Sequence, residues 1–442
     1  MAIQLSDHFT TRKLLRFTFP SIVMMIFTSV YIVVDGFFVS NFVGKTAFAA
    51  VNFIMPYLLL LGALGFMFGT GGSALIAKSM GEGDSEKAQA QFSLFVYVAL
   101  AGGIVLMMLG LLGLRPVAML LGAEGAMLED CVLYGRIILY ALPAYVLQYA
   151  FQAFFVAAEK PKLGLAVTVA AGLTNMVLDA LLVAVIPLGL VGAALATALA
   201  QAVGGLLPLV YFALPNTSRL RLGKTRWNSR WLGQVCLNGS SELMSNISMP
   251  LVGMLYNVQL MRVAGEDGVA AYGVIMYVNM IFLAAFIGYT VGSAPLVSYH
   301  YGAENHEEMR NLRQKSLRMV GVFAVLMVLA AQLFAVPLSE FFVGYDRTLC
   351  EMTVHGFRVF SLSFFFAGFA IYGSGFFTAL NNGPLSALIS FLRTLVFETS
   401  AILILPFLFG IDGIWSSVVV AECMAAVIAL VLMVWKRKVY QY

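Results

Sequence analysis

The chain has 442 residues, of which 61% are hydrophobic and only 11% are charged, and its mean hydropathy is +0.91. Because soluble domains carry about 25% charged residues, this composition excludes a soluble globular protein and indicates a multi-pass membrane protein. The formal net charge of +4 is small, and we expect no nucleic-acid partner.

Twelve apolar runs are long enough to cross a membrane as helices. The longest polar connection, at 214–230, separates six runs from six and is interpreted as a cytoplasmic linker. We therefore predict an all-α integral membrane protein with 12 transmembrane helices in two pseudo-symmetric six-helix bundles, an N-lobe at 1–213 and a C-lobe at 231–442. The approximate spans are 14–40, 47–77, 90–114, 133–157, 163–187, 191–213, 231–262, 268–300, 316–337, 353–380, 385–409 and 413–435.

The two halves carry an internal repeat at a constant offset of 221 residues. An even number of spans in each half makes the repeats parallel, related by an axis along the membrane normal. Transporters with such repeats place their binding site between or within the halves. The matching segments are Gly44–Val51 with Gly265–Tyr272, Gly71–Gly81 with Gly292–Gly302, and Gly189 and Gly192 with Gly410 and Gly413.

Basic residues gather on one side of the predicted spans. Nineteen of the 26 Lys and Arg residues fall on the side of the N-terminus, six fall on the other side, and Arg393 lies within a span. Because cytoplasmic loops carry an excess of Lys and Arg, we predict that both termini are cytoplasmic and that the chain lies in the plasma membrane.

Two carboxylates lie inside apolar runs of the N-lobe, Asp35 on the first span and Asp179 on the fifth. A bare carboxylate in hydrocarbon costs on the order of a few kcal/mol or more, so each needs a partner, a cation or a proton. Asn175 precedes Asp179 by one helical turn and shares its face. At about 1.5 Å per residue, Asp35, Asp179 and Thr197 all reach the outer half of the membrane.

These four residues are therefore predicted to form one site for H⁺ or Na⁺. For Asp35 and for Asp179 the alternative is a helix-end position at the outer headgroups, and it is the weaker alternative for Asp179. For Asn175 and Thr197 it is ordinary hydrogen bonding between helices. Pro20, fifteen residues before Asp35, is a candidate hinge of the first span, with a static kink as the alternative.

The C-lobe does not repeat these acids, because Tyr256 stands at the position of Asp35. Glu242 lies near mid-depth in an unusually polar stretch, which favours a water-filled cavity. A buried pair that holds helices together is the alternative for Glu242.

Three other polar residues of the C-lobe spans receive weaker interpretations. Arg393 and Glu398 are five residues apart, off the ideal spacing for a pair on one helix, and are interpreted as structural rather than ligand-binding. Glu422 aligns with Gln201 and is assigned no role.

Aromatic and Met side chains offer a surface for flat organic cations, through cation–π contacts and adaptable apolar packing. At helical spacing such residues more commonly face lipid or the core. The substrate-binding candidates are Glu242, Met25, Tyr31, Gln148, Phe151, Phe155, Asn246 and Tyr372.

No enzymatic signature is found in the sequence. The four Cys and four His residues show no paired or clustered spacing, and no phosphate-binding loop for ATP is present. We expect a protein that is not an enzyme, that needs no cofactor beyond its coupling ion, and that binds no metal other than Na⁺ at the acid site.

The chain resembles the multidrug and toxic compound extrusion (MATE) family over nearly its whole length, and within it the MepA-like bacterial subgroup. The four N-lobe site residues match, by span and by spacing, the acid cluster of the branch that couples through its N-lobe, and Pro20 matches that branch's bending proline. Glu242 matches the acidic residue common on the family's seventh span. The tenth span, which contains Tyr372, offers no carboxylate and departs from the other bacterial branch, which speaks against a C-lobe cation site.

The resemblance implies a secondary active exporter that antiports lipophilic organic cations outward against H⁺ or Na⁺ entry by alternating access, as a monomer among membrane lipids. The first alternative is a lipid-linked precursor flippase of the same superfamily. It would need a large cationic cavity, whereas only Arg393 is clearly within a span. The second is a membrane-embedded enzyme or other non-transport protein, which would need a nucleophile–base or metal set at one depth.

Overall fold

The computed structural model describes residues 3–442, except for the side chain of Lys45. That residue is one of the six basic residues assigned above to the side opposite the N-terminus, so its placement lies outside the described side chains. Every regular element in the described part is a helix. The elements are α1 (Thr11–Phe38), η1 (Val39–Val43), α2 (Lys45–Gly81), α3 (Ser85–Leu120), α4 (Gly125–Tyr140), α5 (Leu142–Ala157), α6 (Pro161–Asp179), η2 (Ala180–Val185), α7 (Gly189–Ala213), α8 (Ser229–Asn238), α9 (Ser240–Gly302), α10 (His306–Val343), α11 (Arg347–Phe360), η3 (Ser361–Ser363), α12 (Phe364–Ala379), α13 (Gly383–Phe391), η4 (Leu392–Glu398), α14 (Thr399–Phe409), α15 (Ile411–Trp435) and α16 (Arg437–Tyr440).

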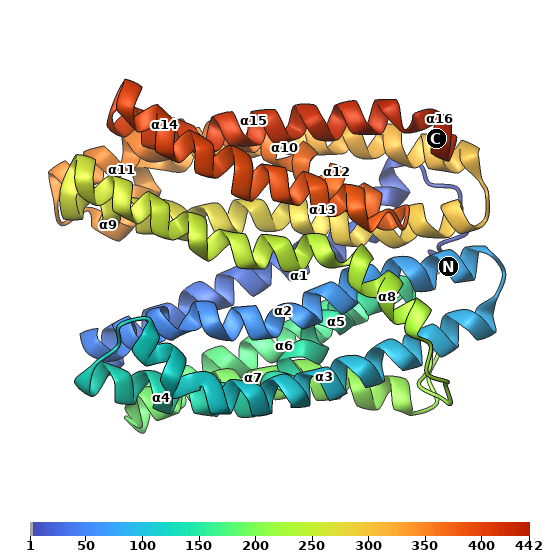
Figure 1. Ribbon diagram of the computed structural model, residues 1–442, viewed down its shortest axis with the longest axis horizontal. Coiled ribbons are helices and arrows are strands. Elements are labelled where there is room, and N and C mark those ends of the chain that lie inside the picture. Colours follow the sequence, from blue (N-terminus) through green and yellow to red (C-terminus); the bar gives the residue numbers. More distant parts are fainter. Residues whose placement is uncertain (1–2) are drawn as a thin grey trace.

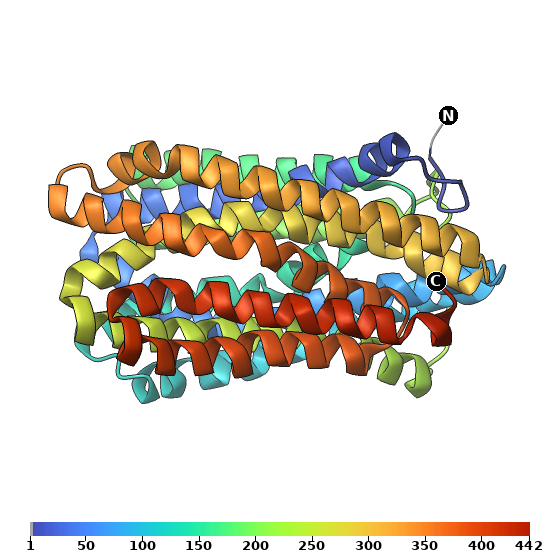
Figure 2. The same cartoon turned by 90° about the horizontal axis from the view of Figure 1, so that it is seen from above.

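The helices form two elongated bundles that lie side by side (Figures 1 and 2). The N-lobe contains α1 to α7 and the C-lobe contains α8 to α15. The segment that precedes α1 and the C-terminal α16 lie at the same end of the molecule, on the right in Figure 1, which we call the terminal end.

Twelve spans follow from the helix list. Ten helices are individually long and apolar enough to cross a membrane, and α4 with α5 makes an eleventh span bent by 56°. The 63-residue α9 counts once in that tally but contains a break at Gly265, where φ is 66° and ψ is −153°. The two legs of α9 therefore belong to two spans, and the predicted number of twelve is confirmed.

The internal repeat is visible in the backbone itself. Gly189 and Gly410, related by the offset of 221, both adopt positive φ, of 60° and 58°. Asp84 caps α3 by accepting a hydrogen bond from a backbone N–H three residues on, and its repeat mate Asn305 caps α10 in the same way. Short polar side chains at such positions satisfy the free N–H groups of a helix start.

The close backbone contacts between the lobes are also made by residues that correspond in the repeat. A Cβ placed on Gly81 would collide with the Tyr299 carbonyl oxygen, and one on its repeat mate Gly302 would collide with the Lys78 carbonyl oxygen. These two glycines let α2 and the second leg of α9 touch backbone to backbone near the terminal end. Only residues without a side chain permit such an approach.

The N-terminal segment before α1 connects the two lobes across the terminal end. The Leu5 backbone N–H donates to Glu159 Oε1 of the N-lobe at 2.8 Å. The Phe9 backbone N–H donates to Glu308 Oε1 of the C-lobe at 2.9 Å. Leu5 and Phe9 are both fully buried, so this segment is part of the contact that holds the lobes together at that end.

Candidate functional site

Both N-lobe carboxylates lie beside changes of helical geometry. Asp35 stands four residues before α1 passes into the π-helical η1, and Asp179 is the last residue of α6, directly before the π-helical η2. A π-turn re-aims side chains and interrupts the regular hydrogen-bond ladder, and such turns occur frequently at functional sites.

Three separate helices bring the four predicted residues together. Thr197 Oγ1 of α7 donates to Asp35 Oδ1 of α1 at 3.4 Å, and Asn175 Nδ2 of α6 donates to Thr197 Oγ1 at 3.4 Å. The carboxyl groups of Asp35 and Asp179 face one another across this cluster. Both hydrogen bonds are longer than usual, so the four side chains lie together but are held only loosely by these bonds.

The interior of this cluster is rich in oxygen atoms that lack protein donors. Asp179 has no exposed surface, and neither of its carboxylate oxygens has a hydrogen-bond partner among the described residues. The Oδ1 atom of Asn175, which is 1% exposed, also lacks a partner there. Buried oxygens of this kind are costly unless a proton or a cation satisfies them, so the arrangement suits a cation site.

Tyr134 on α4 completes the site and was not predicted from the sequence. Its side chain is 1% exposed, its hydroxyl faces Thr197, and both Asp35 and Asp179 lie near it. A single Tyr on an apolar helix carries no sequence signal of its own. Only the packing of α4 against α7 places it beside the acids.

Tyr31 and Gln148 lie in a second polar group of the N-lobe. Tyr31 on α1 faces Gln148 and Tyr149 of α5. The Tyr149 ring packs on the Tyr145 ring at a centroid distance of 4.8 Å. Because Tyr31 is one helical turn from Asp35, this group extends polar contacts from the acids into the N-lobe.

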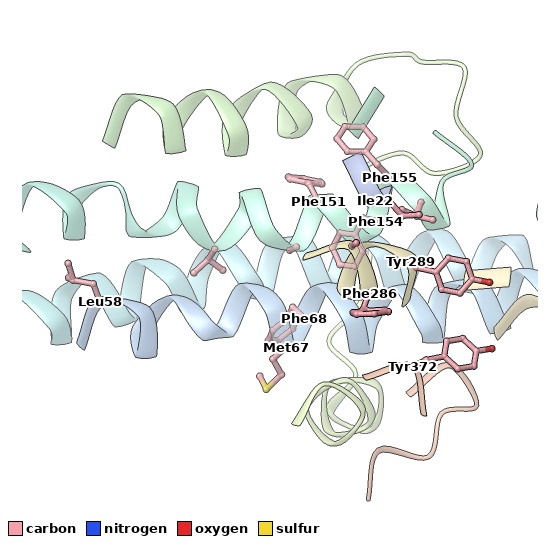
Figure 3. Packing of buried hydrophobic residues seen from close by; sticks show 14 of the residues in the cluster. Ile22, Leu58, Met67, Phe68, Phe151, Phe154, Phe155, Phe286, Tyr289 and Tyr372 are labelled. Carbon is pink, nitrogen blue, oxygen red and sulfur yellow. The ribbon is translucent and has the colours of Figure 1, made fainter. Parts of the chain in front are cut away.

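Phe151 and Phe155 are packed inside the N-lobe, each only 1% exposed. Figure 3 shows them next to Phe154, and both rings pack against Phe212 of α7. Together with Gln148 they line a small, partly open pocket of about 10 Å³, which is room for a single water molecule. These two candidates therefore belong to a closed core in this conformation.

The remaining candidates do not converge on the N-lobe acids. Tyr372 is 1% exposed in the core of the C-lobe, 6.1 Å from Tyr289 between ring centroids (Figure 3). Asn246 turns back to its own helix and donates to the Glu242 carbonyl at 2.8 Å. Met25 is half-buried on α1.

The C-lobe contains a group of charged residues whose ion pair was not predicted from the sequence. Arg393 makes a bidentate pair with Glu422 of α15, with N–O distances of 2.7 to 2.9 Å. The pair joins two helices, and Glu422 had been assigned no role. Glu398 and Glu242 both lie close enough to Arg393 to interact with its charge.

Within residues 3–442 the side chains of His, Cys, Asp and Glu form no group of three or more that could hold a metal ion. The N-lobe site has two carboxylates with an amide and two hydroxyl groups around them. This set is suited to a proton or to a weakly held monovalent cation.

Comparisons with known proteins agree with this fold. The family model MatE matches residues 20–181 and 243–402. Multidrug export protein MepA of Staphylococcus aureus (strain MRSA252) is 23% identical over 425 residues, covering 95% of this chain and 93% of that protein. MepA of Staphylococcus saprophyticus is 23% identical over 422 residues, with the same coverage.

Solved structures give the same result. One described as the outward-facing conformation of a multidrug resistance MATE family transporter of the MOP superfamily superposes with a TM-score of 0.94. Its sequence identity is 21%, and the match covers 100% of this chain and 98% of that chain. Because the family model covers most of both halves, the chain belongs to the MatE family, the multidrug and toxic compound extrusion (MATE) transporters of the cell membrane.

Proposed function

We propose that this protein is a secondary active antiporter that exports lipophilic organic cations in exchange for H⁺ or Na⁺ entering at the N-lobe acids. The observation that carries the proposal is Asp179, a fully buried carboxylate with two unpartnered oxygens beside a second carboxylate, Asp35. Two adjacent carboxylates in a dry site cannot both remain ionised without a cation. A site that gains and loses a cation at different stages of a cycle can drive exchange.

The contacts between the lobes support an outward-facing resting state. The backbone contact at Gly81 and Gly302 and the N-terminal segment both hold the lobes together at the terminal end. The excess of Lys and Arg assigns that end to the cytoplasm. In this proposal the cytoplasmic side is closed, and the acids in the opposite half exchange their cation with the outside.

Glu242 is the proposed contact for the positive charge of the substrate. It lies on the first leg of α9, and its side chain is partly exposed rather than buried. A carboxylate at mid-depth attracts an organic cation.

A flippase for lipid-linked precursors is disfavoured by the pairing of Arg393. A pyrophosphate group needs basic side chains that are free to bind it. Arg393 is instead neutralised by Glu422 through a bidentate ion pair. The observations therefore favour a cationic substrate.

The test is ethidium transport by purified protein in proteoliposomes, with a pH gradient and a Na⁺ gradient imposed separately. We expect one gradient to drive transport by the wild type, and Asp179→Asn to reduce that transport to the rate of empty liposomes. Asp267→Asn makes the same chemical change at an exposed position and should leave the rate unchanged.

Two results would overturn the proposal. One is transport by Asp179→Asn at the wild-type rate. The other is wild-type transport that responds to neither gradient while the protein is folded and inserted. The choice between the two gradients also identifies the coupling ion.

A further inference from the structure

A polar pocket of about 270 Å³ lies between α2, α3 and α8 at the terminal end. Figure 1 shows α8 beside α2 at that end. Ligand clefts in proteins begin at about 300 Å³, so this pocket suits a small ligand or one part of a larger ligand. The charged residues that line it are Lys78 of α2, Glu82 directly after α2, Lys87 of α3 and Arg230 of α8.

The pocket carries more positive charge than its own carboxylate can neutralise. Lys87 Nζ lies 2.9 Å from Glu82 Oε2, and Lys78 Nζ lies 3.8 Å from Glu82 Oε1. Arg230 makes no ion pair within residues 3–442. Asp84 accepts a hydrogen bond from the Lys87 backbone N–H and does not line the pocket. Three basic side chains around one carboxylate favour the binding of an anion.

A buried amide in the wall of the pocket offers a hydrogen-bond donor. Gln91 of α3 lines the pocket and is only 1% exposed. Its Oε1 accepts a hydrogen bond from Ser79 Oγ at 2.8 Å, whereas its Nε2 donates none within residues 3–442. Because buried polar groups are normally hydrogen-bonded, this donor is suited to an acceptor oxygen of a ligand.

The repeat relates this pocket to a place in the C-lobe that the chain itself fills. The offset of 221 relates Lys87 to Glu308 and Arg230 to Phe9. In the C-lobe the Phe9 backbone N–H donates to Glu308 Oε1 at 2.9 Å, and Lys315 Nζ donates to the Phe9 carbonyl oxygen at 2.6 Å. In the N-lobe the two matching positions are both basic and line one pocket. Like charges repel each other, so the N-lobe positions are complementary to an anion between them.

We propose that this pocket binds a phosphate group at the cytoplasmic surface, carried by the headgroup of an anionic lipid or by a small soluble molecule. Arg230 and Lys87 bind the phosphate oxygens, and Gln91 donates a hydrogen bond to one of them. The excess of Lys and Arg assigns this end of the molecule to the cytoplasm. Basic pockets beside transmembrane helices on that side are suited to lipid headgroups. Binding there needs no cation exchange at the N-lobe acids.

The experiment uses the purified full-length chain in detergent and has two arms. Native mass spectrometry counts bound lipid during titration with dioleoyl-phosphatidylglycerol or with dioleoyl-phosphatidylcholine, whose choline charge compensates its phosphate. Isothermal titration calorimetry measures the binding of inorganic phosphate without added lipid. We expect one saturable site per chain, seen as a preference for phosphatidylglycerol, as binding of inorganic phosphate, or as both. A lipid preference alone identifies a headgroup as the source, and phosphate binding identifies a soluble molecule.

Two variants remove one positive charge each from the pocket. Arg230→Gln and Lys87→Gln should each weaken binding about tenfold, the effect of one hydrogen bond to a charged group. The double variant should weaken it about 100-fold if the two contacts act independently. Arg12→Gln is the matched control, because Arg12 is exposed and does not line the pocket. Its affinity should equal that of the wild type, and thermal unfolding checks that all variants are folded.

The proposal is overturned if phosphatidylglycerol binds no better than phosphatidylcholine and inorganic phosphate does not bind. It is also overturned if folded Arg230→Gln and Lys87→Gln both keep the wild-type affinity. A loss in Arg12→Gln as large as that in Arg230→Gln has the same meaning, because the attraction would then come from the surface charge as a whole. Ethidium exchange tests the N-lobe acids separately, so either proposal can fail while the other stands.

Discussion

Thr197 is the side chain that links the two helices carrying the N-lobe acids. Its hydroxyl donates to Asp35 and accepts from Asn175. Thr197→Val has nearly the same shape but cannot hydrogen-bond. We expect it to weaken the apparent affinity for the coupling ion about tenfold, the value of one hydrogen bond to a charged group.

The measurement is the rate of ethidium transport as a function of the driving-ion concentration. Thr197→Ser is the matched variant because it keeps the hydroxyl and loses only a methyl group, so its ion dependence should resemble that of the wild type. Equal behaviour of the Val and Ser variants would show that the hydroxyl takes no part in the ion site.

Arg393 and Glu422 form a buried ion pair whose members depend on each other. Arg393→Met leaves Glu422 uncompensated inside the C-lobe and should destabilise the protein by about 3–5 kcal/mol. The double variant Arg393→Met with Glu422→Met removes both charges and should recover most of that loss. Thermal unfolding in detergent measures both.

An exposed ion pair provides the control for this experiment. Arg347 and Glu351 lie 3.0 Å apart on α11 with side chains 92% and 69% exposed. Arg347→Met should cost about 1 kcal/mol or less, because water screens such pairs. A loss for Arg393→Met as small as that for Arg347→Met would mean that the buried pair does not stabilise the C-lobe.

The site residues could be predicted from the sequence where the geometry of a single helix was enough to place them. The spacing of Asn175 and Asp179 and the depths of Asp35 and Thr197 predicted four side chains that the structure brings together. Their role as an ion site stays a prediction. Tyr134 could not be found in the same way, because its place depends on how one helix packs against another.

At the scale of whole helices, the approach of α2 to the second leg of α9 depends on Gly81 and Gly302. Gly81→Ala places a methyl group against the Tyr299 carbonyl oxygen of the other lobe. Overpacking of this kind costs about 1–3 kcal/mol, and it destabilises only the conformation in which the terminal end is closed. We expect the populations to shift roughly 10- to 100-fold toward the state that is open at that end.

Spin labels at the exposed positions Glu86 and Glu307, one in each lobe, measure the separation of the lobes at the terminal end. Gly81→Ala should broaden and lengthen the distance distribution. Gly273→Ala is the control, since a Cβ there meets no atom within 4 Å. An unchanged distribution in Gly81→Ala would exclude this contact as a gate.

The predicted helices agree well with the observed ones where a span is straight, and less well where it bends. The run at 133–157 was treated as a single span, but the structure divides it into α4 and α5 with a bend of 56°. Pro143, at the start of α5, has no N–H to donate and favours such a bend, but composition does not give its angle. Likewise, the change to π-helix after Asp179 has no sequence signature.

The orientation of the whole molecule can be tested from outside the cell. In a variant without its four native Cys residues, Tyr345→Cys lies between α10 and α11, and Gly223→Cys lies between α7 and α8. Because basic residues favour the cytoplasm, a membrane-impermeant maleimide should label position 345 in intact cells and position 223 only after lysis. The reverse pattern would invert the proposed topology.

The architecture of the whole molecule was predictable because hydropathy and the repeat are both global signals. Twelve apolar runs predicted the spans, and the constant offset of 221 predicted two related halves. The helix list merges two spans into α9 across Gly265, and it divides other spans, such as the one formed by α4 and α5. How the two lobes tilt relative to each other is set by contacts between them, which hydropathy does not encode.

The pairing of Gly81 with Gly302 has a consequence for the ancestry of this fold. The two glycines occupy the same position in each repeat, so their contact lies close to the pseudo-twofold axis. A six-helix chain of half this length could form the same contact with an identical copy of itself, because a twofold axis sets equivalent residues against one another. Duplication and fusion of such a gene would preserve that interface from the start, and would free each copy to acquire its own acids.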